Sequence, residues 1–213
     1  MLAIGLAIFV VRVLYNKGQT DFIEFRIAKE NVPILSDIPV LRMFFINVQY
    51  TSFIAIALAF VVWFVIFKTP FGLRLRSVGE HPMAADTMGI NVTKMRFMGV
   101  MLSGAFGGLA GAVYAVTVTT NFSGTTIVGQ GFLAIAAMIF GKWNPLGALG
   151  AGLFFGFAQA LSIIGSNLPV ISNVPQVLLL IAPYALTILA LAGVVGRADA
   201  PKSVGIPYIK GKR

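Results

Sequence analysis

Few side chains in this chain could carry out acid–base, nucleophilic or metal chemistry. His81 is the only histidine, cysteine is absent, and Asp and Glu together number seven. No paired carboxylates, Ser/His/Asp set or histidine cluster occurs where a catalytic or metal site could form. Because a single histidine is weak evidence for either role, we expect no enzyme activity, no bound metal and no cofactor.

The polar residues also limit the energy source that the protein could use. The chain contains no G-x-x-x-x-G-K-[ST] sequence, so it is not expected to bind ATP itself. All seven carboxylates lie outside the apolar segments, which argues against a proton-coupled carrier, because such carriers place ionisable groups within the membrane. A sodium-coupled carrier that binds its ion with backbone carbonyls remains an alternative.

Three further residues could contact a small molecule that passes through the protein. Gln159 lies within an apolar segment, where an amide needs a partner. It could bind a substrate or hydrogen-bond a neighbouring helix. Asn121 and Phe122 fall near the end of another apolar segment, where they could line a gate or cap a helix. We treat the three residues as a possible substrate pathway.

The elements that must position these residues are apolar. Hydrophobic residues make up 58% of the chain, charged residues 11%, and the mean hydropathy is +0.90, whereas about a quarter of the residues in soluble domains are charged. Such a chain is predicted to lie in a membrane as helices. The expected fold class is all-α, a polytopic transmembrane helical bundle with a short helix outside the bilayer. Its six apolar segments cover residues 1–15, 47–67, 97–120, 126–141, 146–165 and 175–195.

Two of these segments leave alternatives open. Residues 126–141 are short and interrupted by glycine, so they could form a tilted span or a re-entrant helix. Residues 1–15 lack the basic start and the cleavage site of a signal peptide, which favours a membrane helix. This segment is short, and we expect further helices to precede it in the full protein.

The basic residues predict the orientation in the membrane. If residues 68–96 face the cytoplasm, alternation of the spans places Lys142 and the tail after Gly196 on the same side. That side then carries eleven Lys and Arg, whereas the opposite side carries four together with four carboxylates. This excess predicts a cytoplasmic loop and cytoplasmic chain ends. Residues 1–196 would form the transmembrane domain, and residues 197–213 a basic tail that meets anionic lipids or a partner.

Small residues recur at every fourth position of two segments, which places them on one helix face. In lipid, such faces let helix backbones approach closely. Tight packing is one interpretation, and smooth faces that slide during transport are the other. The two series are Gly99, Ser103, Gly107 and Gly111 in the third segment, and Ala148, Gly152, Gly156 and Ala160 in the fifth.

The loop of residues 68–96 contains the short helix expected outside the bilayer. Pro82 suits a first helical position and Gly89 a C-cap, so a helix is predicted from Pro82 to Met88. Glu80 would lie near the positive end of this helix. Because two turns are not stable alone in water and methionines are adaptable contact residues, we expect the helix to dock on a cytoplasmic partner.

Three stretches of the chain carry a family resemblance: FGLRLRSVGEHPMAADTMGINV (71–92), IFGKWNPLGALGAGLFFGFAQAL (139–161) and ILSDIPVL (34–41). They resemble permeases of ABC importers in the branch that serves nucleosides, ribose-type sugars and branched-chain amino acids, and look most like the nucleoside permeases. VGIPY (204–208) also suits this family, and the resemblance covers residues 33–208. Family members are longer chains whose first helices have no counterpart here.

The resemblance implies a translocation subunit of an ATP-driven importer. In such importers a second permease completes the pathway, ABC ATPase subunits bind underneath, and an external substrate-binding lipoprotein delivers the cargo. Membrane lipids surround the permease, and nucleic acid is not an expected partner. The alternatives are a sugar or branched-chain amino acid as cargo, and a membrane scaffold without transport. By position, the residues that contact the ATPase would be Glu80, His81, Pro82, Met83, Ala84, Ala85, Asp86, Met88 and Gly89.

Overall fold

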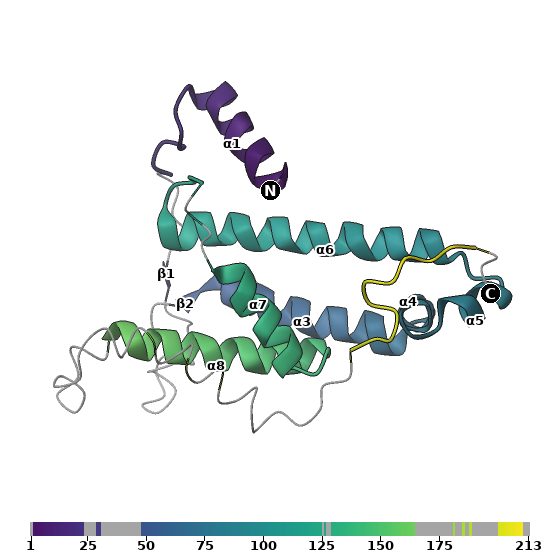
Figure 1. Cartoon of the computed structure of the whole chain (residues 1–213). Helices are drawn as coiled ribbons and strands as arrows, with labels where there is room; N and C mark the ends of the chain where they lie inside the picture. Colours follow the sequence, from purple (N-terminus) through teal and green to yellow (C-terminus); the bar gives the residue numbers. More distant parts are fainter. Residues whose placement is uncertain are drawn as a thin grey trace. The chain divides into compact units, whose positions relative to one another are not determined.

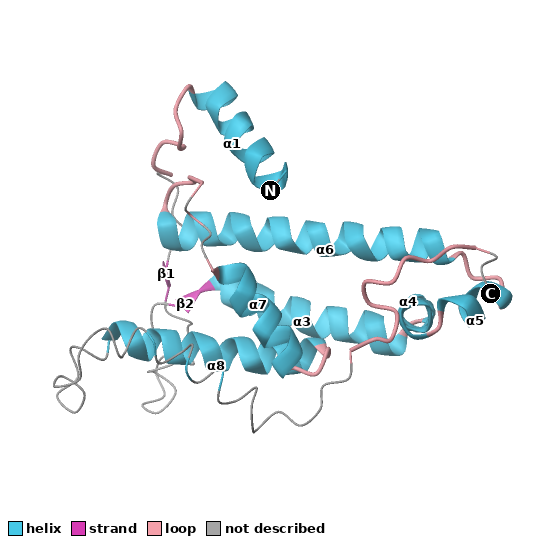
Figure 2. Ribbon diagram, in the orientation of Figure 1, coloured by secondary structure: helices cyan, strands magenta, loops and turns pink. Residues whose placement is uncertain are grey.

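The computed structural model describes residues 2–23, 29–30, 48–124, 126, 129–164 and 200–210, together with the single positions 181, 185 and 188 (Figure 1). Helices prevail in this part of the chain, as the sequence predicts (Figure 2). The chain divides into two compact units. The first contains Met1–Leu58 and Phe97–Val128, and the second contains Ala59–Arg96 and Gly129–Arg213.

Among the described residues, two helices are long and apolar enough to cross a membrane: α3 (Tyr50–Lys68), and α6 (Val92–Tyr114) with the π-helix η1 (Ala115–Thr119) that continues it. At 1.5 Å per residue, the 19 residues of α3 span about 28 Å, which is close to the ~30 Å thickness of the hydrocarbon layer. The described part of the chain buries none of the residues of α3. The surface of this helix is therefore available to lipid or to other helices.

The start of α6 differs from the expected start at Phe97. The helix begins at Val92, because Asn91 Oδ1 accepts a hydrogen bond from the Lys94 backbone N–H at 2.9 Å and caps the first turn. Its first turns therefore belong to the basic loop, and they carry Lys94 and Arg96.

Three shorter apolar helices match other expected segments. These are α1 (Leu2–Tyr15), α7 (Gln130–Phe140) and α8 (Pro145–Ile164). Helix α7 has 11 residues and begins after its N-cap Gly129, which has a left-handed backbone conformation with a φ of +80°. The sixth expected segment, residues 175–195, lies outside the described residues apart from three single positions. The number of membrane spans therefore stays a prediction.

Helices α7 and α8 form a tight hairpin in the second unit. Lys142 and Trp143 both have positive φ values, 52° and 58°, so the turn between the helices is unusually sharp. Asn144 Oδ1 accepts a hydrogen bond from the Leu146 N–H at 3.0 Å and starts α8. A Cβ atom on Gly141 or Gly147 would collide with the backbone of the other side of the turn. Glycine is therefore required at both ends of GKWNPLG for the helices to approach.

The core of this hairpin is aromatic. Phe155 is only 1% exposed and packs edge-on against Phe140, with 5.5 Å between ring centroids, and against Phe154 at 5.7 Å. Ala151 and Ala158 lie on the same buried face of α8.

In the first unit, backbone hydrogen bonds join the segment after α1 to the segment after η1. The N–H of Thr20 donates to the carbonyl of Phe122 at 2.9 Å, and the N–H of Phe122 donates to Thr20 Oγ1 at 2.8 Å. Gln19 and Ser123 form an antiparallel bridge beside them. In the same unit β1 (Lys29–Glu30) pairs antiparallel with β2 (Val48–Gln49).

Candidate functional site

The candidate site begins at a sharp corner after α3. Thr69 Oγ1 donates to the carbonyl of Val65 at 2.6 Å and accepts from the N–H of Gly72 at 3.3 Å, so one side chain ends α3 and caps α4 (Pro70–Glu80). Pro70 occupies the first position of α4, where its missing N–H costs nothing. A Cβ on Gly72 would collide with the carbonyls of Val65 and Ile66. The corner therefore depends on Thr69, Pro70 and Gly72.

Helix α4 was not expected from the sequence, whereas α5 (Pro82–Thr87) was. Pro82 separates the two helices, because the residue before a proline avoids helical dihedral angles. His81 accordingly has φ −138° and ψ 82°. The structure ends α5 one residue before the expected Met88, which serves as its C-cap.

The end of α5 is a complete Schellman motif. Gly89 has a φ of +80°, its N–H donates to the Asp86 carbonyl at 2.9 Å, and the Ile90 N–H donates to the Ala85 carbonyl at 3.0 Å. The sequence-based expectation that Gly89 ends this helix is confirmed.

A small hydrophobic cluster holds α4, α5 and the start of α6 together. Val78 of α4, Ala85 of α5 and Val92 of α6 are 1%, 4% and 1% exposed. Ile90, Met95 and Tyr208 pack around these three residues. The two turns of α5 are thus stabilised within the chain itself.

Tyr208 belongs to a C-terminal segment, residues 200–210, that we call the strap. The strap runs along the ends of α4 and α6 instead of leaving the protein as a free basic tail. The N–H of Ser203 donates to the Gly79 carbonyl at 3.0 Å, and Ser203 Oγ donates to the Glu80 carbonyl at 3.3 Å. Both carbonyls lie at the end of α4, where no intrahelical partner is available. The strap therefore completes the hydrogen bonding of that helix.

Two charged side chains add to the attachment of the strap. Glu80 Oε2 accepts a hydrogen bond from the Lys202 N–H at 3.1 Å, and Arg96 Nη1 donates to the Ile206 carbonyl at 2.7 Å. Desolvation, together with the hydrogen bond and the negative charge of Asp86, raises the pKa of Tyr208. The neutral phenol is thus the form that the folded protein favours.

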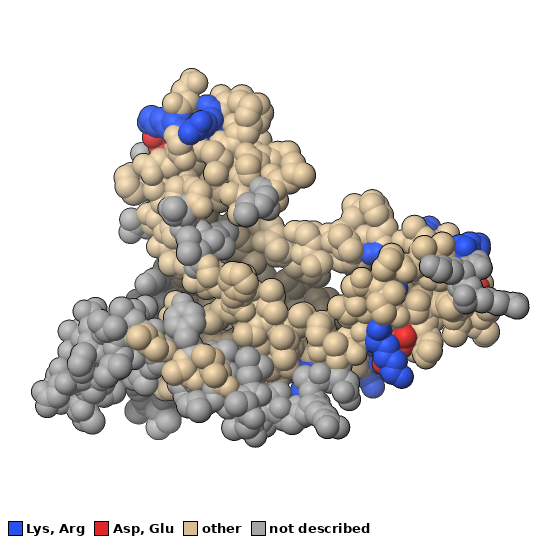
Figure 3. Space-filling view, in the orientation of Figure 1, with Lys and Arg blue, Asp and Glu red and all other residues tan. Residues whose placement is uncertain are grey.

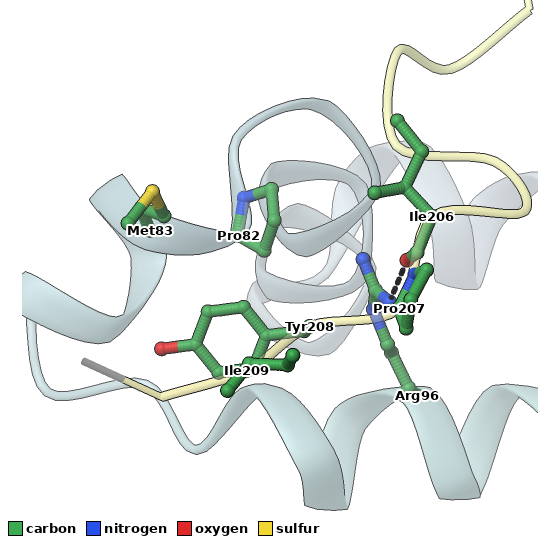
Figure 4. A pocket seen from close by; sticks show the side chains of 7 residues that line it. All are labelled: Pro82, Met83, Arg96, Ile206, Pro207, Tyr208 and Ile209. Atoms are coloured by element: carbon green, nitrogen blue, oxygen red, sulfur yellow. Dashed lines mark hydrogen bonds between the residues drawn. The ribbon is translucent and has the colours of Figure 1, made fainter. Parts of the chain in front are cut away.

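A groove of about 350 Å³ lies between α5 and the strap (Figure 4). Its walls are mainly apolar, and the side chain of Arg96 reaches toward the strap between them. The space-filling view shows a group of charged side chains over α4, α5 and the strap (Figure 3). The groove is lined by Pro82, Met83, Arg96, Ile206, Pro207, Tyr208 and Ile209.

The expected contact residues of the short helix fall into two groups. Ala85 faces the hydrophobic cluster, and Pro82 and Asp86 are half-buried. Glu80 is exposed, but its carboxylate binds the strap instead of the N-terminus of α5. The residues that remain exposed without such an internal contact in the described ranges are His81, Met83, Ala84, Met88 and Gly89.

Three glycines of the small-residue faces have open space around them among the described residues. A Cβ on Gly107 of α6, or on Gly152 or Gly156 of α8, would meet no atom within 4 Å. Gly99 and Gly111 are half-buried, whereas Ser103 is exposed. These faces are therefore open to helices that the described part of the chain does not supply.

The three possible pathway residues belong to different units of the chain. Asn121 and Phe122 belong to the first unit, and Gln159 belongs to the second, where it lies exposed on α8. The Asn121 carbonyl accepts a hydrogen bond from Thr119 Oγ1 at 2.8 Å. Phe122 borders a groove of about 190 Å³ that faces α1. The preceding π-helix is a feature often found at functional sites.

In the described ranges, no three His, Asp or Glu side chains come together. The strap residues were missed by the sequence analysis, because a segment that pairs with residues more than a hundred positions away has no local periodicity. The motif VGIPY was the signal that could have pointed to it.

The sequence of the chain is similar to those of known transport proteins. A family model described as branched-chain amino acid transport system / permease component matches residues 1–195. The chain is 65% identical over its full length to the guanosine ABC transporter permease protein NupQ of Bacillus subtilis, and covers 67% of it. It is 50% identical to the nucleoside ABC transporter permease protein NupC of Lactococcus lactis subsp. cremoris, again covering 67%.

A third relative is more distant. The putative glucose ABC transporter permease protein TsgC13 of Haloferax volcanii is 33% identical over 63% of this chain and 41% of the relative. No solved structure matches the chain. The family match and the two full-length similarities establish that the chain is a membrane protein and belongs to the family of branched-chain amino acid transport system permease components.

Proposed function

We propose that the protein is the membrane-spanning permease subunit of an ATP-driven ABC importer of nucleosides. The observation that carries this proposal is the 65% identity to a permease named for guanosine, together with the 50% identity to one named for nucleosides. The chain forms part of the translocation pathway, and a separate ATPase subunit hydrolyses ATP.

The short helix α5 is the element that couples this permease to its ATPase. It lies outside the two long apolar helices, and the cluster of Val78, Ala85 and Val92 holds it rigidly. Met83 of α5 and Met88 at its C-cap are 46% and 81% exposed. Methionine adapts to the shape of a partner surface. An apolar, rigid and exposed helix end supports docking on another subunit.

The remaining parts of the assembly follow from this assignment. Residues 1–196 form the transmembrane permease domain with six apolar segments, and residues 68–96 and 197–213 face the cytoplasm. A second permease subunit, an external substrate-binding lipoprotein and membrane lipids complete the surroundings. The open faces around Gly107, Gly152 and Gly156 support packing against further helices. Asn121, Phe122 and Gln159 remain our candidates for the substrate pathway.

The cargo is tested by uptake. A strain that lacks this gene is complemented with it, and the uptake of labelled uridine and guanosine is measured with and without ATP depletion. We expect restored, ATP-dependent uptake that excess nucleoside suppresses and excess ribose does not. Unchanged nucleoside uptake in the deletion strain would contradict the proposed cargo. Branched-chain amino acids are the second candidate, because the family description names them.

The coupling role is tested with two adjacent alanines. Ala84 is exposed, so Ala84→Glu is expected to insert normally and to lose co-purification of the ATPase and uptake together. Ala85 is 4% exposed, so Ala85→Glu would place an unpaired carboxylate in the cluster and lower the yield of folded protein. Normal ATPase association and uptake in Ala84→Glu would contradict the coupling role of α5.

A further inference from the structure

The strap forms one wall of the groove beside α5. Met83 of α5 lies on one side of this groove, and Ile206 and Ile209 of the strap lie on the other (Figure 4). The two walls come from segments that are far apart in the sequence. A surface built from both would not be recognised from either segment alone.

Both walls are held in fixed positions. The strap is joined to α4 through the Lys202 and Ser203 backbone N–H groups, and to α6 through the hydrogen bond from Arg96 to the Ile206 carbonyl. Tyr208 packs against the cluster that also holds α5. The groove between them is therefore a preformed feature, which lowers the entropic cost of binding a partner.

Three of the apolar side chains that line the groove are exposed. Met83 is 46%, Ile206 58% and Ile209 57% exposed. The groove is lined by Pro82 and Met83 at the start of α5, so a subunit that docks on this part of α5 also covers the groove.

We propose that the ATPase-binding surface is composite, with α5 as one wall and the strap as the other, and that the groove receives an apolar side chain of the ATPase subunit. This inference rests on the proposed coupling function. It assigns the C-terminal segment to the docking surface and gives Ile206 and Ile209 a direct contact with the ATPase.

The position of the strap is tested first by a disulfide. A Cβ on Gly79 would lie 3.6 Å from the Cβ of Pro201, which falls within the range of about 3.5–4.5 Å found in disulfides. The chain has no cysteine, so Gly79→Cys/Pro201→Cys introduces the only pair. In purified, membrane-reconstituted transporter we expect a rapid cross-link under mild oxidation and unchanged ATP-driven uptake. No cross-link, or a loss of uptake that reductant reverses, would overturn the proposal of a fixed strap.

The docking surface is then tested with three aspartate substitutions at exposed apolar residues. Met88→Asp changes α5 outside the groove, Ile209→Asp changes the strap wall, and Val204→Asp is a matched control on the strap that does not line the groove. We expect co-purification of the ATPase to fall at least about tenfold in Met88→Asp and Ile209→Asp, equivalent to ~1.4 kcal/mol, and to stay normal in Val204→Asp. The disulfide, formed in the Ile209→Asp background, shows that the strap remains in place.

The other outcomes separate the two levels of the proposal. Normal ATPase binding by Ile209→Asp with loss in Met88→Asp would overturn the composite surface and leave the coupling role of α5. Equal losses in Ile209→Asp and Val204→Asp would also overturn it, since the groove would then not be distinguished from the rest of the strap. Normal binding by both Met88→Asp and Ile209→Asp would overturn the coupling role together with the inference.

Discussion

The carboxylate of Glu80 accepts a hydrogen bond from the Lys202 backbone N–H at 3.1 Å, which joins the last residue of α4 to the strap. Sequence reasoning assigned this carboxylate to the positive end of α5. The structure instead gives it a partner in the C-terminal segment, so Glu80 contributes to holding the strap.

Replacing Glu80 should loosen the strap. In Glu80→Ala the hydrogen bond is lost, and since a single bond contributes about 0.5–1.5 kcal/mol, we expect tryptic cleavage after Lys202 to become about two- to tenfold faster. Glu80→Gln keeps an accepting oxygen and should fall between Glu80→Ala and the wild type. Equal cleavage rates in all three proteins would show that this bond does not restrain the strap.

Gly89 should be sensitive to replacement for a reason that involves no contact. Its φ is +80°, and a Cβ there would meet nothing within 4 Å, so Gly89→Ala pays only the left-handed backbone cost of about 1–2 kcal/mol. We expect a lower melting temperature for the detergent-solubilised protein. Gly89→Asn should recover much of the loss, because asparagine adopts this conformation more readily. A melting temperature for Gly89→Ala at or above that of the wild type would contradict the Schellman geometry.

Replacing a glycine of the α7–α8 hairpin with alanine should lower the yield of folded protein much more than the same replacement on an open helix face. A Cβ on Gly147 would collide with the Gly141 backbone, so Gly147→Ala should separate the helices and strongly reduce the yield of folded protein. Gly152→Ala is the matched control on α8, because a Cβ at that position has open space within the described chain. When both variants are expressed without partner subunits, a similar yield would contradict the close approach at Gly147.

The ionisation of Tyr208 should depend on its contact with Asp86. The pKa of Tyr208 is raised above its ordinary value of 10.0, first by desolvation and then by Asp86. A tyrosine with a raised folded-state pKa stabilises the folded protein below the unfolded-state pKa, and this stabilisation disappears as the pH rises through the folded-state pKa. The strap contact is thus intact at neutral pH and weakens only at strongly alkaline pH.

This ionisation is measured by phenolate absorbance, with Tyr208→Phe subtracted to isolate the signal of Tyr208. Asp86→Asn should lower the pKa of Tyr208 only partly, because desolvation, the larger cause, remains. A Tyr208 that titrates at or below its ordinary pKa in the folded protein would contradict the packing of its ring.

The helices were predictable where one local signal sufficed. The apolar runs located α3 and α8 closely, and Pro82 and Gly89 located α5 to within one residue. Helix α4 was not predicted, although Thr69 and Pro70 form an ordinary helix start. Its mixture of apolar, basic and glycine residues is also typical of a loop. The start of α6 was missed because Asn91 extends the helix into charged sequence.

The candidate site was predictable only in part. Pro82 and Gly89 located the short helix within residues 68–96. Two helical turns are too short for the sequence to show which of their residues are exposed and which are buried. Ala84 and Ala85 are chemically identical, and only packing against Val78 and Val92 separates the exposed one from the buried one. The strap depends on contacts between residues more than a hundred positions apart, which no local pattern encodes.

Val78, Ala85 and Val92 are spaced seven residues apart, although they lie in three different helices. In an unbroken helix this spacing would align them along one side, with a drift of about 20° at each step. The helix breaks at Pro82 and Gly89 instead bring the three side chains together in one cluster. Without them, residues 70–114 could extend as a single rod of about 68 Å. One proline and one glycine thus decide whether residues 70–114 form three helices that pack together or one long helix.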